Sequence, residues 1–372
     1  MRSESDISKK GGSDRVEALS PARWWEREAG AVRCLLCPRT CIIKDGKIGF
    51  CMVRRNIGGS LFSTNYGIVS VSTIDNIEKK PIFHFLPGSK LYSVGSFGCN
   101  LRCLYCQNYP LVEGGFEAAP HRRLPPRDLV SEAISRGADG IAWTFNEPIV
   151  WSEYVIETSR LAHKEGLYCM LNTNGYIMDG PRDELLEVVD AIKVDIKGFS
   201  NRFYNEVCGG SLGPVLRTCR AALGKGIHIE IAYPVVRGMN DSPDEIGRFC
   251  EWVRLNLGSE TPVHFIMVHS FHRIAFNAEI KLEDLEKIRI SAIQSGLNYV
   301  YIGGTTKSPA QNTYCPGCGD LLISRAGDAS AEKVYYKDQQ VSRFCPSRSD
   351  VRVMLSGRSC PRCGRATAIV TK

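Results

Sequence analysis

Three cysteines fall within eight residues of the stretch Gly98-Cys99-Asn100-Leu101-Arg102-Cys103-Leu104-Tyr105-Cys106-Gln107-Asn108. The stretch comes directly after an apolar run, Leu91 to Phe97, which predicts a buried strand. Four-iron clusters usually take four thiolates, so a C-x3-C-x2-C loop that offers three leaves one iron open to another ligand. A zinc knuckle with a distant fourth ligand and unligated core thiols are the alternatives, although zinc pairs usually come as C-x2-C. A strand that leads into such a loop favours an active site at the strand's C-terminal end.

After this loop, short apolar segments alternate with longer amphipathic ones. Strict alternation of strand and helix predicts parallel pairing through crossover helices. The six or seven such units predict an α/β fold with a partial (β/α)6 TIM-like barrel at residues 90–304, and an open doubly wound sheet is the alternative. The predicted strands after the loop are Gly140 to Phe145, Leu167 to Asn172, Ala191 to Ile196, Ile227 to Tyr233, Val263 to Val268 and Tyr299 to Ile302.

On either fold, ligands bind at the C-terminal ends of the strands. Any single polar residue there could be a turn residue or a helix cap, but recurrence at successive strand ends favours a shared site. Asp195 and Lys197 lie two apart in a strand, so they face the same side, and we expect an ion pair or polar contact that points into the barrel. The candidate site residues at these ends are Asn146, Glu147, Asn172, Asn174, Asp195 and Lys197.

A second cysteine set precedes the barrel. Its spacing, C-x2-C-x3-C-x9-C, supplies four thiolates, enough to close the coordination of zinc or of an iron–sulfur cluster. A closed site of this kind is structural or relays electrons, and unligated surface thiols are the alternative. We expect a cysteine-rich metal module at residues 22–89, with a helix from Ala22 to Ala29 at its start. The four cysteines are Cys34, Cys37, Cys41 and Cys51.

A third set lies near the C-terminus, where Cys315-Pro316-Gly317-Cys318-Gly319 and Cys360-Pro361-Arg362-Cys363-Gly364 form two knuckles. Two such knuckles predict a zinc-ribbon-like module at residues 305–372, with zinc held by Cys315, Cys318, Cys360 and Cys363. Cys345 lies between them as a spare thiol or a substitute ligand.

Composition sets the broad class. The chain has 372 residues, of which 43% are hydrophobic and 23% charged, which is typical of a globular protein with a full core. No apolar stretch approaches the ~20 residues that cross a bilayer. The 16 cysteines without a secretion signal indicate metal sites in a reducing compartment, and we expect a cytoplasmic protein with a disordered tail at residues 1–21. The net charge of +7 is modest for this length and favours nucleic-acid binding only weakly.

The order of the motifs resembles that of the AmmeMemoRadiSam-system enzymes of the radical S-adenosylmethionine (radical SAM) superfamily, which are relatives of pyruvate formate-lyase-activating enzymes. The resemblance covers residues 34–322. The motifs that carry it are the four-cysteine N-terminal set, Ile77-Glu78-Lys79-Lys80-Pro81 to Pro87-Gly88-Ser89, Cys99 to Asn108, Thr144 to Pro148, Asp195 to Gly198 and Asn312 to Gly319.

The resemblance implies that Cys99, Cys103 and Cys106 hold a [4Fe-4S] cluster whose open iron binds SAM. Reductive cleavage of SAM then gives a 5′-deoxyadenosyl radical that abstracts hydrogen from a substrate. Tyr105 would pack beside the cluster or adenine, and Asn146, Glu147, Asn172 and Asn174 would position SAM, with Asp195 and Lys197 as candidate catalytic residues.

The same resemblance implies a protein substrate or a Memo-like partner, and an electron donor such as ferredoxin or flavodoxin. Two other functions remain open on the sequence alone. One is a metal-binding scaffold protein, which is suggested by the predicted zinc-ribbon-like module and by the net positive charge. The other is radical SAM modification of RNA.

Overall fold

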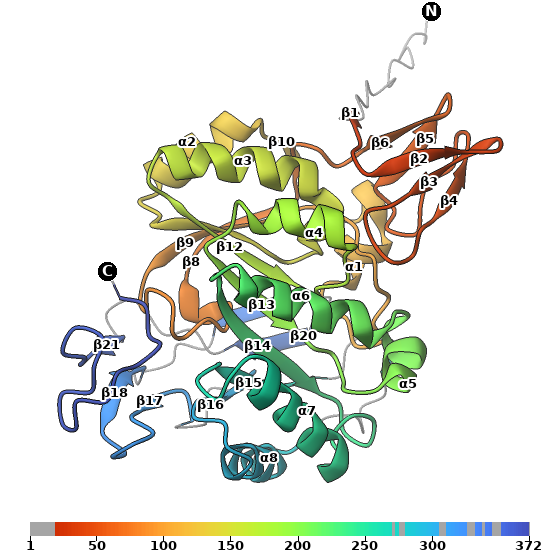
Figure 1. Ribbon diagram of the computed structural model, residues 1–372. Helices are drawn as coiled ribbons and strands as arrows, with labels where there is room; N and C mark the ends of the chain where they lie inside the picture. The colour runs from red at the N-terminus through yellow and green to blue at the C-terminus, as the bar shows by residue number, and fades with distance from the viewer. Residues whose placement is uncertain are drawn as a thin grey trace, which may run out of the picture.

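Figure 1 shows the computed structural model of the chain, which describes residues 19–269, 272–274, 280–304, 310–325, 332–336, 339–343 and 351–371. Cys345 and most of the expected N-terminal tail lie outside these ranges. Within them, no helix combines the length and the apolar character that crossing a membrane requires.

Eight strands form the central sheet, in the order β16-β15-β14-β13-β12-β11-β9-β8. Every neighbouring pair from β9 to β16 is parallel, whereas β8 runs antiparallel to β9. The order follows the chain without reversal, so the sheet lacks the switch point that defines a doubly wound sheet. The strands are β8 (Val71–Asn76), β9 (Lys90–Gly95), β11 (Gly140–Trp143), β12 (Tyr168–Thr173), β13 (Ala191–Asp195), β14 (His228–Val235), β15 (Val263–Met267) and β16 (Val300–Gly303).

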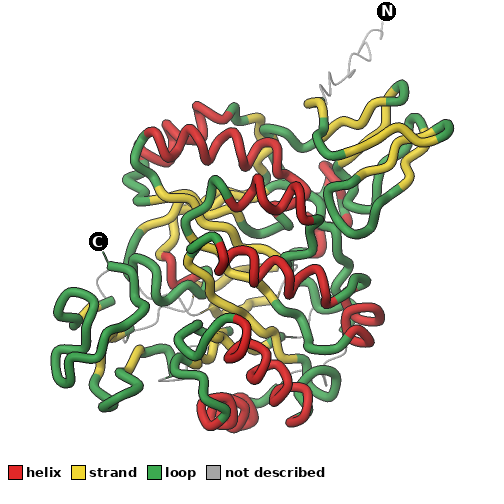
Figure 2. The backbone as a smooth tube through the Cα atoms, in the orientation of Figure 1, coloured by secondary structure: helices red, strands yellow, loops and turns green. Residues whose placement is uncertain are grey.

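Helices connect the parallel strands and follow one another along the sheet (Figure 2). Right-handed crossovers between strands in sequential order place successive helices on the same face. The helical segments are η1 (Ile77–Lys79), α1 (Tyr109–Glu113), η2 (Gly115–Glu117), α2 (Pro126–Ser135), η3 (Pro148–Trp151), α3 (Ser152–Lys164), α4 (Asp179–Leu186), α5 (Asn201–Phe203), η4 (Tyr204–Cys208), α6 (Leu212–Gly224), α7 (Pro243–Asn256) and α8 (Leu282–Gln294).

The main core lies between the sheet and these helices. Trp143 of β11 meets Trp151 and Tyr154 at ring-centroid distances of 5.6 and 6.0 Å. The indole nitrogens of both tryptophans still donate hydrogen bonds, to Ser159 Oγ and to the backbone oxygen of Asn65. Burial of such large rings supplies much of the hydrophobic stabilisation of a core.

Two small antiparallel sheets form the N-terminal module. They are β1 (Ser20–Pro21), β6 (Ser60–Ser63) and β5 (Arg54–Ile57), and β2 (Trp25–Glu28), β3 (Ala31–Cys34) and β4 (Ile42–Lys44). Two expectations are wrong here. Ser20 and Pro21 pair with β6, so the tail does not extend to residue 21. The expected helix from Ala22 to Ala29 is a strand, because Trp24 has a φ of 55° that no right-handed helix accepts and Trp25 pairs with Cys34.

Three further small sheets complete the described strands, two of them in the C-terminal part of the chain. A sheet of β17 (Thr313–Tyr314), β18 (Leu321–Ser324) and β21 (Arg352–Val353) carries the third cysteine set, while β19 (Glu332–Tyr336) pairs with β20 (Gln339–Arg343), and β7 (Ile68–Val69) pairs with β10 (Arg122–Arg123). The segment after β8 reaches this part of the chain, since the Val370 nitrogen donates to the His84 oxygen at 2.7 Å. Arg325 also donates to the backbone oxygen of Phe83.

Candidate active site

A cavity of about 330 Å³ opens at the C-terminal ends of the parallel strands. This volume lies within the range of sites that enclose a small organic ligand. The structure places all ten of the site residues predicted for residues 90–304 around this one cavity. They are Cys99, Cys103, Tyr105, Cys106, Asn146, Glu147, Asn172, Asn174, Asp195 and Lys197.

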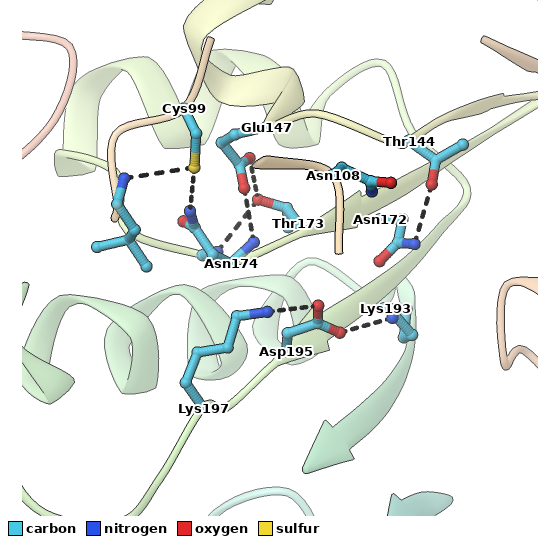
Figure 3. Close-up of polar contacts among 12 residues, drawn as sticks. Cys99, Asn108, Thr144, Glu147, Asn172, Thr173, Asn174, Lys193, Asp195 and Lys197 are labelled. Carbon is cyan, nitrogen blue, oxygen red and sulfur yellow. Dashed lines mark hydrogen bonds and ion pairs between the residues drawn. The ribbon is translucent and has the colours of Figure 1, made fainter. Parts of the chain in front are cut away.

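The three-cysteine loop follows β9 and is held by backbone hydrogen bonds to residues 207 and 208. The Arg102 and Leu104 nitrogens donate to the Cys208 and Val207 oxygens at 2.8 and 2.9 Å. The sulfur of Cys99 accepts hydrogen bonds from the Leu101 nitrogen at 3.3 Å and from Asn174 Nδ2 at 3.6 Å (Figure 3). Burial raises the pKa of the Cys99 thiol well above its ordinary value, against the hydrogen bond from the Leu101 nitrogen, which lowers it.

Glu147 is the most completely bonded carboxylate of the cavity. Its Oε1 accepts from Thr173 Oγ1 at 2.6 Å and from the Ile149 nitrogen at 3.1 Å, and its Oε2 accepts from the Asn174 nitrogen at 2.9 Å (Figure 3). Burial raises the pKa of Glu147 to about 7, against these hydrogen bonds, which lower it. A carboxylate has about four acceptor positions, so one remains for a donor in the cavity.

The three asparagines differ in what their amides do. Asn146 accepts from the Ser96 nitrogen at 2.8 Å and donates to the Phe97 oxygen at 3.0 Å, which holds the end of β9 beside the end of β11. Asn174 donates to Asn100 Oδ1 at 2.8 Å and thereby supports the cysteine loop. Asn172 donates to Thr144 Oγ1 at 3.1 Å. Asn146 also donates to the Gly98 oxygen at 3.2 Å, so Asn146 and Asn174 both contact the Gly98–Asn108 stretch in addition to lining the cavity.

Asp195 lies between two lysines of the same strand face, as Figure 3 shows. Lys197 Nζ lies 2.8 Å from one of its oxygens, which agrees with the predicted ion pair, and Lys193 Nζ lies 2.5 Å from the other. Burial alone would raise the pKa of Asp195, but the two ammonium groups outweigh burial and lower that pKa to about 2. The carboxylate is therefore ionised at neutral pH and cannot serve as a general acid there.

Sequence reasoning missed several residues that line the same cavity: Lys193, Thr144, Thr173, Asn108 and Lys80. Lys193 carried a usable signal, because Lys193, Asp195 and Lys197 alternate along one strand and so share a face. The side chain of Asn108 donates to the Phe145 oxygen at 2.5 Å, a contact between segments far apart in the sequence. Phe145 itself has a φ of 71°, a strained conformation at the end of a site strand.

The spacing of the sulfur atoms tests whether the loop suits a cluster. Among the described residues, the only set of three or more cysteines whose sulfurs all lie within 4.8 Å of one another is Cys315, Cys318, Cys360 and Cys363. The sulfurs of Cys99, Cys103 and Cys106 are therefore more widely spread around their cavity. Four sulfurs on one zinc ion lie about 3.8 Å apart, so at least one pair of sulfurs in this loop lies farther apart than a single zinc ion would hold them.

Comparison with known proteins agrees with this geometry. Residues 93–250 match the family model described as the Radical SAM superfamily. An uncharacterized protein of Methanocaldococcus jannaschii is 43% identical over 82% of this chain and 92% of its own length. The chain belongs to the radical SAM superfamily. This membership identifies it as an enzyme and favours the catalytic interpretation over a metal-binding scaffold.

Other similar proteins share less of the sequence. The pyruvate formate-lyase 1-activating enzyme of Escherichia coli is 28% identical over 51% of this chain and 79% of its own length. A crystal structure of a radical SAM methyltransferase from Sphaerobacter thermophilus is 18% identical, with a TM-score of 0.47 over 64% of this chain and 71% of that one.

Proposed function

We propose that this radical SAM enzyme binds a [4Fe-4S] cluster through Cys99, Cys103 and Cys106 and cleaves SAM reductively. The observation that carries the proposal is one cavity that holds three thiols of a single loop together with polar side chains from three successive strands. When bound, such a cluster supplies one electron to the sulfonium of SAM, which yields a 5′-deoxyadenosyl radical that takes hydrogen from a substrate.

The residues of the cavity suit the parts of SAM. Glu147 keeps one acceptor position, which suits the α-ammonium group, and the Asn172 oxygen can accept from a ribose hydroxyl. Asn174 and Asn146 hold the cysteine loop, so they orient the thiols. Lys193 and Lys197 both pair with Asp195, and because two ammonium groups share one carboxylate, the group leaves net positive charge beside the ligand. Tyr105 is buried against the same cavity and packs beside its contents.

The fold proposed for this chemistry is a partial TIM-like barrel at residues 90–304. It is flanked by a cysteine-rich module at residues 22–89 and a zinc-ribbon-like module at residues 305–372. Support for zinc comes from the C-terminal thiols, since Cys315 and Cys363 lie 3.6 Å apart and Cys318 and Cys360 lie 3.7 Å apart. Those distances are close to the edge of a zinc tetrathiolate, about 3.8 Å.

The proposed substrate is a protein. This proposal rests on the likeness to enzymes named as activators of pyruvate formate-lyase and of benzylsuccinate synthase. A Memo-like partner, a ferredoxin or flavodoxin as electron donor, and a cytoplasmic location complete the proposal.

The test is product formation. Anaerobically reconstituted enzyme, given dithionite and SAM, should release 5′-deoxyadenosine, and Cys103→Ala should reduce the product at least 100-fold. Cys250→Ala removes a buried thiol of α7 that lines neither the cavity nor a cysteine set, so it should leave the yield unchanged. Equal product from the wild type and Cys103→Ala would disprove the proposal.

A further inference from the structure

The N-terminal cysteine set surrounds a small cavity of its own. Cys34 ends β3, Cys37 and Cys41 lie on the next loop, and Cys51 precedes β5. All four line this second cavity, and all four are free thiols. Cys41 is partly exposed and the other three are buried. Four thiols around one enclosed space are a complete ligand set with no open position.

The chain contains two other cysteine sets, so the spacing of its sulfurs can be compared internally. The C-terminal set is compact, with all four sulfurs within 4.8 Å of one another, as a single zinc ion requires. Over the described residues, no three sulfurs of the N-terminal set meet that limit, and the same is true of the cysteines at residues 99, 103 and 106. In a four-iron cluster each thiolate binds a different iron, so the sulfurs lie roughly 6 Å apart. In the N-terminal set, as in the active-site loop, the sulfurs are therefore not gathered as closely as those of the C-terminal set.

Buried positive charge faces the same cavity. Arg54 is only 1% exposed, and its Nε has no hydrogen-bond partner among the described residues. One of its terminal nitrogens bonds the Glu153 carboxylate at 2.6 Å, whereas the side chain of Arg39 donates to the backbone oxygens of Asn100 and Gly209. Arg39 also lines the cavity. A tetrathiolate zinc site and an oxidised four-iron tetrathiolate cluster both carry a net charge of −2. The arginines therefore favour a bound anionic centre of either kind. The wider spacing of the sulfurs favours the four-iron cluster over zinc.

The second cavity adjoins the active-site loop. Asn100 of that loop lines it, and Arg39 donates to the Asn100 oxygen at 2.5 Å. A Cβ atom on Gly98 would collide with the carbonyl oxygen of Cys51, so the two cysteine segments are packed backbone to backbone. Thr40 and Met52, each next to a cysteine of the set, have φ values of 42° and 67°. Strained backbone of this kind is common where loops clamp a ligand.

We propose that Cys34, Cys37, Cys41 and Cys51 bind a second [4Fe-4S] cluster, closed by four protein thiolates, which lies beside the active-site loop. The proposal goes beyond SAM cleavage and does not depend on it. A cluster without an open iron has no position for SAM, so this site differs in chemistry from the one at Cys99.

The experiment uses the full chain without its active-site cysteines. The triple variant Cys99→Ala, Cys103→Ala, Cys106→Ala is reconstituted anaerobically with iron and sulfide, and its iron, sulfide and zinc are counted with a Mössbauer spectrum. We expect about four irons and four sulfides per chain in a [4Fe-4S] spectrum. Addition of Cys37→Ala and Cys51→Ala should remove that iron and leave zinc unchanged. A triple variant that binds two zinc ions and no iron would overturn the proposal.

Metal counts in the wild type keep the test independent of whether the variants fold. The wild type should hold about eight irons and one zinc ion, against about four irons and two zinc ions if the N-terminal set binds zinc. A failure of the proposed function, in which the Cys99 loop binds no cluster, gives a different pattern of iron contents. If the Cys99 loop binds no cluster, the wild type and the triple variant contain equal iron. Cys250→Ala is the matched control and should retain the full iron content.

Discussion

At the scale of single residues, Glu147 connects the segment after β11 to the end of β12. Three donors of the chain fill most of its acceptor positions. The sequence identified Glu147 as polar and close to a strand end. The sequence did not show that donors of the chain itself occupy most acceptor positions of this carboxylate. Thr173 and Asn174 come within hydrogen-bond distance of Glu147 only because β11 pairs with β12.

Replacement Glu147→Gln should weaken SAM binding about tenfold or more, while the iron content stays unchanged. The amide has one oxygen where the carboxylate has two, so either an internal donor or the ligand ammonium loses its acceptor. Calorimetric titration of the reconstituted protein with SAM measures the effect. Exposed Glu187→Gln is the control and should bind SAM as the wild type does. Equal affinity for Glu147→Gln and wild type would rule out this role.

Gly98 is a second residue whose identity the structure explains. Its φ is 88°, and a Cβ would meet the Cys51 carbonyl and the Val53 side chain. We expect Gly98→Ala to lower the melting temperature and to reduce the iron content, because both cysteine segments must move apart. Gly137→Ala is a matched control, since Gly137 has a φ of 65° but open space around it, and should cost only about 1 kcal/mol. Similar melting temperatures for the two variants would contradict the packing argument.

At the scale of elements, the sequence pattern predicted most of the parallel sheet and its helices. Apolar runs and amphipathic segments gave each parallel strand and its following helix within a few residues, because burial of both strand faces leaves a continuous apolar run. The hydrophobic pattern did not predict those strands that form only because they pair with a neighbouring strand. β2 became a strand through its pairing with β3, and β8 added an antiparallel partner to β9.

The charged residues at the end of β13 alternate in the sequence and gather beside the site. Lys193 and Asp195 of β13 form a single, largely buried charge group with Lys197, which lies two residues beyond the end of the strand. Asp195→Asn leaves two buried lysines without their counter-ion and should lower the free energy of unfolding by about 3 kcal/mol. Urea unfolding followed by circular dichroism measures it. Glu206→Gln, which breaks an exposed pair with Arg202, is the control and should change stability by less than about 0.5 kcal/mol. Equal losses of unfolding free energy in the two variants would show that the charge group of Lys193, Asp195 and Lys197 does not stabilise the fold.

At the scale of the whole molecule, a buried polar cluster joins distant parts of the chain below the active site. Glu230 of β14 accepts from the backbone nitrogens of Phe83 and His84 and bonds His264 of β15 at 2.6 Å. His84 Nε2 lies 2.6 Å from the hydroxyl of Tyr301 on β16. No local pattern predicts this cluster, because its members come from three strands and a loop.

This cluster makes stability depend on pH. Burial lowers the pKa of His84 to about 3, against the Glu230 carboxylate, so the folded protein keeps this imidazole neutral. The unfolded chain takes up a proton near pH 6.5, so stability is complete above that pH and is lost as pH falls toward 3. From pH 7 to pH 5 the wild type should lose about 2 kcal/mol more than His84→Gln does. Urea unfolding at both pH values measures this difference, and identical losses would exclude His84 as the source.

The central claim is that the cavity at the strand ends binds SAM at an open iron of the Cys99 loop. Electron paramagnetic resonance of the dithionite-reduced enzyme, recorded before and after addition of SAM, tests it directly. We predict that SAM shifts the g values of the signal that Cys103→Ala abolishes, since a ligand that binds the cluster changes its electronic structure. A Cys103-dependent signal that saturating SAM leaves unchanged would contradict the claim.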